Sequence, residues 1–215
     1  MNLCMNKTLI LFSGGIDSTT VLYWALNRGW EVLALLIDYP SQPKKEKEAA
    51  RKILKKLKVQ LIEAKIPFLR NLRHLKKSSI KSKGFKKSPG FGYIPMRNMV
   101  FYSVAGYYAE ILDVNYILAG HTEEDSKTYS DDSKEFFRLI ESTYNQSLNR
   151  SYITENKNLK IILPLIGLSD FDTVMLGKEL RVPFHLTWSC WNDLNTPCKN
   201  CFACKQRKFA LATIV

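Results

Sequence analysis

A glycine-rich loop between an expected strand and an expected helix most restricts how this chain can fold. Residues 8–12 form an apolar run of strand length, and residues 18–28 have the composition of a helix that Gly29 ends. The loop between them is Ser13-Gly14-Gly15-Ile16-Asp17-Ser18-Thr19. At such a turn the free main-chain N–H groups of the helix start attract anions. The sequence therefore predicts a phosphate-binding loop in a parallel α/β fold.

The side chains of this loop suit an anionic ligand. Gly14 and Gly15 allow backbone conformations and a close ligand approach that a Cβ would prevent. The hydroxyl groups of Ser13, Ser18 and Thr19 add donors beside the positive end of the helix. The loop lacks the Gly-Lys-Ser/Thr ending of a Walker loop and does not match Gly-x-Gly-x-x-Gly. The simpler alternative is a turn that precedes a helix without binding a ligand.

The rest of the chain alternates strand-like and helix-like segments, which is typical of a Rossmann-like α/β fold with a parallel sheet flanked by helices. Further strands are expected at residues 32–37, 59–66, 115–119 and 160–165. Further helices are expected at residues 44–57, 96–111, 136–148, 171–180 and 202–213. Residues 67–93 lack clear periodicity, so we expect a long loop or insertion near the active site.

The length and charge of the chain limit its domain organisation and its partners. A chain of 215 residues fits a main domain at 1–181 with a small module at 182–215 packed on it. No apolar stretch approaches the roughly 20 residues that span a bilayer, and no secretion signal is recognisable, so we expect a cytoplasmic protein without membrane association. The net charge of +12 comes mostly from residues 44–58 and 65–87. These lysines form either a solvated face or an attraction for polyanions such as nucleic acid.

Four cysteines near the carboxyl end predict a metal site. Cys190, Cys198, Cys201 and Cys204 have the spacing C-x7-C-x2-C-x2-C, and four thiolates complete the tetrahedral shell of structural zinc. Disulfides are not expected in a reducing cytoplasm. An iron–sulfur cluster is the alternative, because it also takes four thiolates. Cys4 is left over and is interpreted as an ordinary thiol.

The loop resembles the signature of the N-type ATP pyrophosphatases, a family of adenylating enzymes with an adenine nucleotide alpha hydrolase-like fold. The resemblance implies that residues 12–19 and Gly120 bind ATP and grip its pyrophosphate. It also implies that Asp17 acts with Mg²⁺, although an acidic side chain here could equally cap the helix. Ser13, Asp17, Ser18 and Arg97 are the catalytic residues that the resemblance implies. The loop-derived nucleotide-binding set is Phe12, Ser13, Gly14, Gly15, Ile16, Asp17, Ser18 and Thr19.

Three further segments narrow the resemblance to the 7-cyano-7-deazaguanine synthase family. They are the Pro95-Met96-Arg97-Asn98 segment, residues 120–131, and the tail from Thr187 to Arg207. By this resemblance the substrate-binding residues are Arg97, Asn98, Asp125, Tyr129, Asp131 and Trp188. Arg97 and Asn98 could instead cap the helix that follows, and residues 125–131 could be a polar loop without a ligand. His121 is open to two interpretations, a general base or a structural hydrogen-bonding residue.

The family converts 7-carboxy-7-deazaguanine and ammonia to the nitrile 7-cyano-7-deazaguanine, a precursor of queuosine and archaeosine, through adenylated intermediates. The resemblance therefore implies ATP, Mg²⁺ and Zn²⁺ as cofactors, and a homodimer would be unsurprising. Asp132 and Asp170 stand where the family has a cysteine and a lysine. These changes motivate a second hypothesis, in which a deazaguanine acid is activated and joined to a protein or nucleic acid, for example in antiviral defence. A third is an inactive nucleic-acid-binding or scaffold protein that contains zinc.

Overall fold

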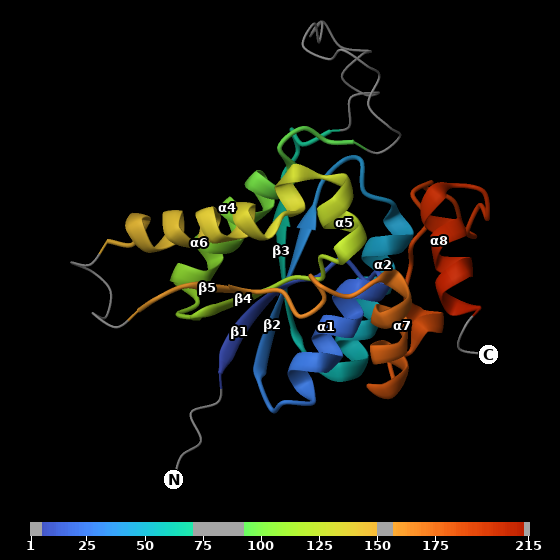
Figure 1. The fold of residues 1–215 in the computed structure, drawn as a ribbon, viewed down its shortest axis with the longest axis horizontal. Helices are drawn as coiled ribbons and strands as arrows, with labels where there is room; N and C mark the ends of the chain where they lie inside the picture. Colours follow the sequence, from blue (N-terminus) through green and yellow to red (C-terminus); the bar gives the residue numbers. More distant parts are fainter. Residues whose placement is uncertain (1–5, 71–92, 150–156, 213–215) are drawn as a thin grey trace, which may run out of the picture.

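The computed structural model describes residues 6–70, 93–149 and 157–212. In this part of the chain, parallel strands form a five-stranded sheet in the order β3-β2-β1-β4-β5 (Figure 1). The strands are β1 (Lys7–Leu11), β2 (Glu31–Asp38), β3 (Gln60–Lys65), β4 (Tyr116–Leu118) and β5 (Lys160–Ile162). Cys4 and most of the expected loop at 67–93 lie outside the described residues. The predicted parallel α/β fold is confirmed.

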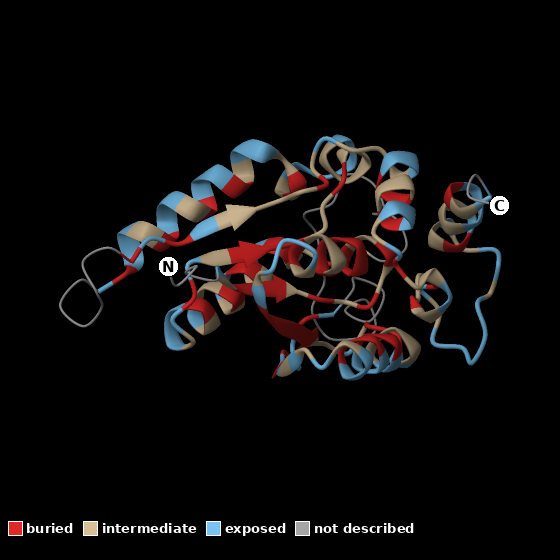
Figure 2. Cartoon of the chain, turned by 90° about the horizontal axis from the view of Figure 1, so that it is seen from below, coloured by how far each residue is buried: buried red, intermediate tan, exposed pale blue. Residues whose placement is uncertain are grey.

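Side chains that alternate along each strand divide the hydrophobic core between the two faces of the sheet. Leu33, Leu35 and Ile37 of β2 face one cluster of buried side chains, whereas Ala34 and Leu36 face the other. Successive side chains of a strand point to opposite faces. The continuous apolar run of β2 therefore marks a strand covered on both sides, as its sequence indicates. Figure 2 shows the buried residues gathered in the strands and on the inner sides of the helices.

Helices cover both faces of the sheet. Helix α4 (Arg97–Ile111) and helix α6 (Lys134–Ser147) pack on one face, and α1 (Ile16–Leu26) and α2 (Lys44–Leu57) pack on the other (Figure 1). Helix α7 (Asp170–Glu179) lies against α1, and α8 (Phe202–Leu211) lies against α7. A small cluster of Ile16, Val174 and Ala210 joins these three helices. The cysteine-containing tail thus packs on the main body, while a domain boundary at 181/182 stays a prediction.

The strand order creates an opening at the carboxyl ends of β1 and β4. After β1 the chain adds β2 and β3 on one side, and it then returns to add β4 and β5 on the other side. Connections leave β1 and β4 in opposite directions, which separates the loops that follow them. Ligands of open parallel sheets bind in the crevice at such a switch point. The glycine-rich loop follows β1 and Gly120 follows β4, so both lie at this edge.

Short helical turns are where the structure differs most from the expected elements. Residues 123–128 form helix α5 (Glu123–Thr128), followed by the 3-10 turns η1 (Ser130–Asp132) and, later, η2 (Phe184–Leu186). Thr122 and Asp125 make a reciprocal capping box that begins α5. Strand β5 is shorter than the expected 160–165 because the chain turns after Ile162. Within the described ranges, no helix combines the length and apolarity that a membrane crossing requires.

Candidate functional site

Two connected hollows lie at the opening between β1 and β4. The larger has a volume of about 660 Å³ and extends from the glycine-rich loop to the tail. The smaller, of about 230 Å³, reaches under the loop towards β2 and α4. The residues that line both are Ser13, Asp17, Tyr39, Gln42, Glu46, Arg97 and Asp125. These shared side chains form a junction, which is the natural position for reacting groups of two ligands to meet.

The glycine-rich loop is held in shape by its own side chains and by α2. Gly14 has a φ of +86°, and a Cβ there would lie 2.6 Å from the main-chain nitrogen of Ala50. The main-chain N–H of Gly15 donates to Ser13 Oγ over 3.2 Å, and the hydroxyl groups of Ser13 and Ser18 are 3.2 Å apart. Only glycine suits the position of Gly14, because of its conformation and its neighbour.

The predicted loop residues differ in their access to the hollows. Ser13, Gly15, Ile16 and Asp17 line the larger one, and Phe12 and Ser18 line the smaller one. Thr19 is fully buried, and its hydroxyl donates to the main-chain oxygen of Gly15 over 2.6 Å. Thr19 therefore fixes the first turn of α1 and does not face a ligand. Gly120 approaches the loop so closely that a Cβ would lie 2.8 Å from the carbonyl carbon of Asp17.

Asp17 is the centre of a negatively charged wall. Burial, together with the charges of Asp125 and Asp170, raises the pKa of Asp17 to about 7. Burial and the neighbouring Glu124 and Asp125 also raise the pKa of Asp170, which accepts a hydrogen bond from Gln206 over 3.2 Å. Asp170, which replaces the lysine of the resembled pattern, lines the larger hollow. A cation would relieve this repulsion, because opposite charge favours the ionised carboxylates.

The start of α4 brings one of its two predicted residues to the junction. Arg97 lines both hollows, and its Cζ lies 5.9 Å from the centroid of the Phe101 ring. Asn98 is 2% exposed, and its Nδ2 donates to the main-chain oxygen of Asp131 and to Asp132 Oδ1 over 3.0 and 2.8 Å. Both amide hydrogens of Asn98 are thus used inside the protein. Asn98 lines only the smaller hollow, whereas Arg97 lines both.

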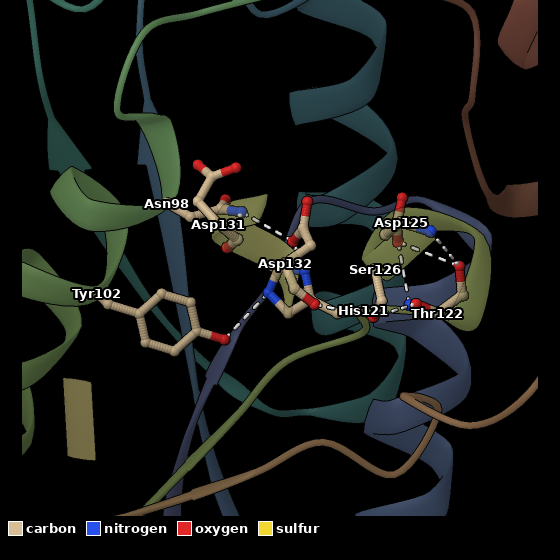
Figure 3. Close-up of polar contacts among 8 residues, drawn as sticks. All are labelled: Asn98, Tyr102, His121, Thr122, Asp125, Ser126, Asp131 and Asp132. Carbon is tan, nitrogen blue, oxygen red and sulfur yellow. Dashed lines mark hydrogen bonds and ion pairs between the residues drawn. The ribbon is translucent and has the colours of Figure 1, made fainter. Parts of the chain in front are cut away.

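Asp132 lines the smaller hollow and connects three segments through polar contacts (Figure 3). His121 Nδ1 lies 2.5 Å from Asp132 Oδ1, and His121 Nε2 lies 3.0 Å from the hydroxyl of Tyr102. Asp132 is 2% exposed and also accepts from Asn98. Because both ring nitrogens of His121 have partners, its geometry fits the interpretation as a structural residue better than that as a general base. Asp132, which stands where the resembled pattern has a cysteine, thus pairs with a histidine.

The three predicted substrate-binding residues between positions 125 and 131 differ in whether they line the hollows. Asp125 lines both hollows, and its Oδ2 accepts from the main-chain N–H of Thr122 over 3.0 Å (Figure 3). Tyr129 lines the larger hollow and is 38% exposed. Asp131 contributes its main-chain carbonyl to Asn98, and its side chain is not among those that line the two hollows. Asp125 and Tyr129, but not Asp131, are therefore at the predicted site.

Glu46 and Gln42 were not predicted from the sequence. Both line the junction from the beginning of α2, although Glu46 belongs to a lysine-rich segment that is typical of a solvated face. Burial raises the pKa of Glu46 to about 7, against the opposing effects of Arg97 and of hydrogen bonds with Gln42 and Ser13. The apolar stripe of α2 fixes this orientation, but it gives no sign that the adjacent acid faces a cavity.

The tail closes the outer side of the larger hollow. The main-chain N–H of Trp188 donates to the main-chain oxygen of Gly14 over 3.0 Å. Arg207 of α8 donates to Thr187 Oγ1 and to the main-chain oxygen of Phe184 over 2.7 and 2.6 Å. Trp188 and Arg207 both line the hollow. The tail is therefore part of the site wall and contacts the glycine-rich loop directly.

The four tail cysteines come together as predicted. The sulfur atoms of Cys190, Cys198, Cys201 and Cys204 all lie within 4.8 Å of one another. Main-chain N–H groups of Asn200 and Cys201 lower the pKa of Cys198 to about 6, which favours the thiolate that binds metals. The Sγ atoms of Cys198 and Cys204 are 3.9 Å apart. A tetrahedral zinc with Zn–S bonds of about 2.3 Å requires sulfur separations of about 3.8 Å, so the donor set fits.

This chain is similar over most of its length to proteins named 7-cyano-7-deazaguanine synthase. The 7-cyano-7-deazaguanine synthase of Picrophilus torridus is 37% identical over 210 residues, which cover 94% of this chain and 86% of that protein. The 7-cyano-7-deazaguanine synthase of Aquifex aeolicus is 33% identical over 214 residues, which cover 96% of this chain and 97% of that protein. The predicted resemblance is therefore confirmed by whole-chain similarity.

Solved structures share the fold at lower identity. The U34-tRNA thiolase NcsA from Methanococcus maripaludis has a TM-score of 0.53 and 15% identity, covering 99% of this chain and 67% of that one. A 4-thiouridine synthetase solved with RNA and ATP has a TM-score of 0.54 and 21% identity, covering 93% of this chain and 46% of that one. The sequence pattern of the family described as queuosine biosynthesis protein QueC matches residues 7–215. This chain belongs to the QueC family.

Proposed function

We propose that the protein is a 7-cyano-7-deazaguanine synthase, which uses ATP and ammonia to convert 7-carboxy-7-deazaguanine to its nitrile. The observation that carries the proposal is that the family pattern matches residues 7–215 in a chain whose glycine-rich loop and Arg97 line one junction. The reaction needs a site where a nucleotide and a flat carboxylate-bearing ring meet. The two hollows that share this junction satisfy that requirement.

The chemistry explains why two ATP molecules are needed. The substrate carboxylate attacks the α-phosphorus of ATP and releases pyrophosphate, and ammonia then displaces AMP to give the amide and a proton. The amide oxygen attacks a second ATP, again releasing pyrophosphate. Loss of AMP and a proton from this adenylated amide leaves the nitrile. Each adenylation turns a poor leaving oxygen into a good one, and both carboxylate oxygens finish on AMP.

The residues of the junction have distinct tasks in this proposal. The N–H groups at the start of α1 and the hydroxyl groups of Ser13 and Ser18 stabilise the charge that develops on pyrophosphate. Arg97 holds the substrate carboxylate near the α-phosphate, because a guanidinium binds carboxylates and phosphates. Gly14 and Gly120 allow the close packing that keeps the loop in place. Asn98 acts indirectly by fixing the turn at Asp131.

Two metals fit the residues that are present. Mg²⁺ is commonly held by one or two carboxylates together with ligand phosphates; Asp17 and Asp125 would hold it, and it would neutralise the departing pyrophosphate. Zn²⁺ fits the cysteine cluster, where it would stabilise the tail. We favour zinc over an iron–sulfur cluster because a cluster of several atoms would need the four sulfurs to lie further apart than the 4.8 Å limit observed.

Isotope transfer provides a direct test. The protein is incubated with 7-carboxy-7-deazaguanine labelled with ¹⁸O in the carboxylate, together with ATP, Mg²⁺ and ammonia, and the products are identified by mass spectrometry. We expect the nitrile, two pyrophosphates per nitrile, and one ¹⁸O atom in each AMP. Asp17→Asn, which removes the acidic side chain next to the loop, is expected to lower the rate by at least about a hundredfold.

The alternatives give different products. A folded protein that leaves the substrate unchanged under these conditions would contradict the proposal. AMP and pyrophosphate without nitrile, together with a deazaguanine adduct on an added protein or nucleic acid, would indicate the conjugating enzyme. Failure to release pyrophosphate with any of these substrates would indicate the inactive scaffold.

Two further expectations accompany this function. The homodimer stays a prediction; Met99, Tyr107 and Ile111 of α4 expose apolar surface on one side of that helix, and sedimentation would measure the oligomeric state. Cytoplasmic location also stays a prediction. The small-molecule substrate is consistent with the family that the chain belongs to.

A further inference from the structure

Gln42 and Glu46 place two acceptor groups at the junction of the hollows. They lie four residues apart where the chain enters α2, and Pro43 precedes the first residue of that helix. Both line the larger and the smaller hollow. Gln42 is 7% exposed, and its main-chain N–H donates to the main-chain oxygen of Tyr39 over 3.0 Å. The position of this pair is therefore set by main-chain contacts and by the packed face of α2.

The acceptor of Gln42 is left open towards a ligand. Within the described part of the chain, Gln42 Oε1 is buried and has no hydrogen-bond partner. The Gln42 side chain does form a hydrogen bond with Glu46, and Ser13 forms another. A buried carbonyl without a donor costs about 1–3 kcal/mol. Such a cost is removed when a ligand supplies an N–H group.

Glu46 has few competing cations nearby. Lys47, its neighbour on α2, pairs with Asp38 over 2.6 Å. Arg97 stands across the junction and favours the ionised form of Glu46, but burial has the larger effect on its pKa. An acidic side chain held in this way costs folding stability. It is well suited to accept hydrogen bonds from a neutral ligand that carries several N–H groups.

Aromatic side chains beside these acceptors suit a flat ring. The rings of Tyr39 and Phe101 have their centroids 5.6 Å apart, and Tyr39 lines both hollows while Phe101 lines the smaller one. Arg97 lies near the Phe101 ring, on α4 rather than α2. The junction thus combines acceptors from α2 and the segment before it, a donor from α4 and an aromatic wall.

Guanine-type and adenine-type rings present opposite groups to such acceptors. A deazaguanine has an N1–H and a 2-amino group on adjacent positions, and both donate. A deazaadenine has an unprotonated N1 and no 2-amino group, so it has no matching donors there. We propose that Glu46 and Gln42 bind the N1–H and 2-amino edge of the substrate ring and so select a deazaguanine. This inference rests on the proposed function for the identity of the ring, and it assigns specificity to Glu46 of α2 and to Gln42 in the segment before that helix.

Binding of three free bases tests the inference without turnover. The probes are 7-deazaguanine, 7-deazahypoxanthine, which lacks only the 2-amino group, and 7-deazaadenine. Dissociation constants are measured by calorimetry in the presence of Mg²⁺ and α,β-methylene-ATP, which cannot release pyrophosphate. The wild-type protein is expected to prefer 7-deazaguanine over each of the others by about tenfold or more, because a site that accepts from an N–H discriminates against ligands that lack it.

The variant Glu46→Gln keeps the size of the side chain and removes one of its acceptor oxygens. Its preference for 7-deazaguanine over 7-deazahypoxanthine is expected to fall by about tenfold, with unchanged affinity for the ATP analogue. Glu48→Gln is the matched control, because Glu48 is on the same helix, exposed, and paired with Lys45. It should behave as the wild type. Thermal unfolding of both variants verifies that they fold.

Two results would overturn the inference. One is an unchanged base preference in Glu46→Gln, and the other is a loss of ATP-analogue affinity in place of the base preference, which would assign Glu46 to the nucleotide. Failure of the proposed function looks different. In that case the wild-type protein makes no nitrile in the isotope assay, whatever the outcome of base binding.

Discussion

At the scale of single residues, the site contains acids whose charge is opposed by their surroundings. Asp17 and Glu46 both have pKa values raised to about 7, chiefly by burial. Such groups are common at functional sites, since folding alone would not favour them. Both line the junction together with Ser13, where a cationic or hydrogen-bonding ligand would favour their ionised forms.

The raised pKa of Glu46 predicts a pH-dependent stability. A carboxyl whose pKa is higher in the folded state binds protons more tightly when folded, so its contribution to stability is present at low pH and is lost as the pH rises through about 7. Glu46→Gln removes this effect. We expect the ligand-free variant to be more stable than the wild type at pH 8 by on the order of 1–3 kcal/mol, with little difference at pH 4.

Urea unfolding at the two pH values measures this difference. Arg97 and Lys47 are the cationic side chains whose charges act on Glu46, and both are unchanged in the variant. Glu48→Gln serves again as the control. A variant that is no more stable than the wild type at pH 8 would show that Glu46 is adequately solvated or paired.

At the scale of elements, a buried pair joins the segments that follow β4 to helix α4. Asp132 of η1 accepts from Asn98 of α4 and contacts His121 after β4. The hydroxyl of Ser126 in α5 donates to the main-chain oxygen of Asp132 over 2.8 Å. These contacts hold α4, α5 and η1 together beside the smaller hollow. Arg97 is next to Asn98, so its placement depends on this connection.

Removal of Asp132 tests the connection. In Asp132→Ala, His121 and Asn98 lose a buried acceptor, and we expect unfolding free energy to fall by about 2–4 kcal/mol. Chemical denaturation provides the measurement. Asp131→Ala is the matched control, because the described contact of Asp131 uses its main-chain carbonyl, which the substitution retains. If both variants lost the same unfolding free energy, the contacts of the Asp132 side chain would not be what stabilises this region.

At the scale of the whole molecule, the cysteine module is connected to the nucleotide loop. Trp188, which bonds to Gly14 through its main chain, also donates from Nε1 to the main-chain oxygen of Cys190 over 2.9 Å. Arg207 ties α8 to the segment at Phe184 and Thr187. A change in the metal site can therefore reach the loop through directly bonded neighbours.

Metal removal is expected to weaken nucleotide binding as well as stability. Structural zinc contributes directly to folding free energy, so chelation or Cys201→Ser should lower the melting temperature and raise the dissociation constant for ATP. Added Zn²⁺ should restore both properties of the chelated protein. Elemental measurement should find about one zinc per chain; iron in its place, or normal ATP binding after complete metal loss, would contradict this prediction.

The sequence predicted the features that depend on local pattern. The apolar run of β2, the amphipathic face of α2 and the strand–loop–helix around Gly14 follow from residue spacing alone, and the structure confirms them. Helix α5 was missed although Thr122 and Asp125 carry the capping-box spacing, because the segment is short and polar. The Asp132–His121 pair and the inward position of Glu46 depend on packing between distant segments, which no local pattern encodes.

The hydrogen bond between Trp188 and Gly14 joins segments that lie far apart in the sequence, and this affects the order in which the site forms during synthesis. A ribosome releases the amino-terminal residues first, and they begin to fold before the tail exists. The glycine-rich loop can therefore take shape early, but its outer wall is made from residues that are translated about 170 positions later. A nascent chain, or one whose translation stops before Trp188, has the loop without the contact that closes it.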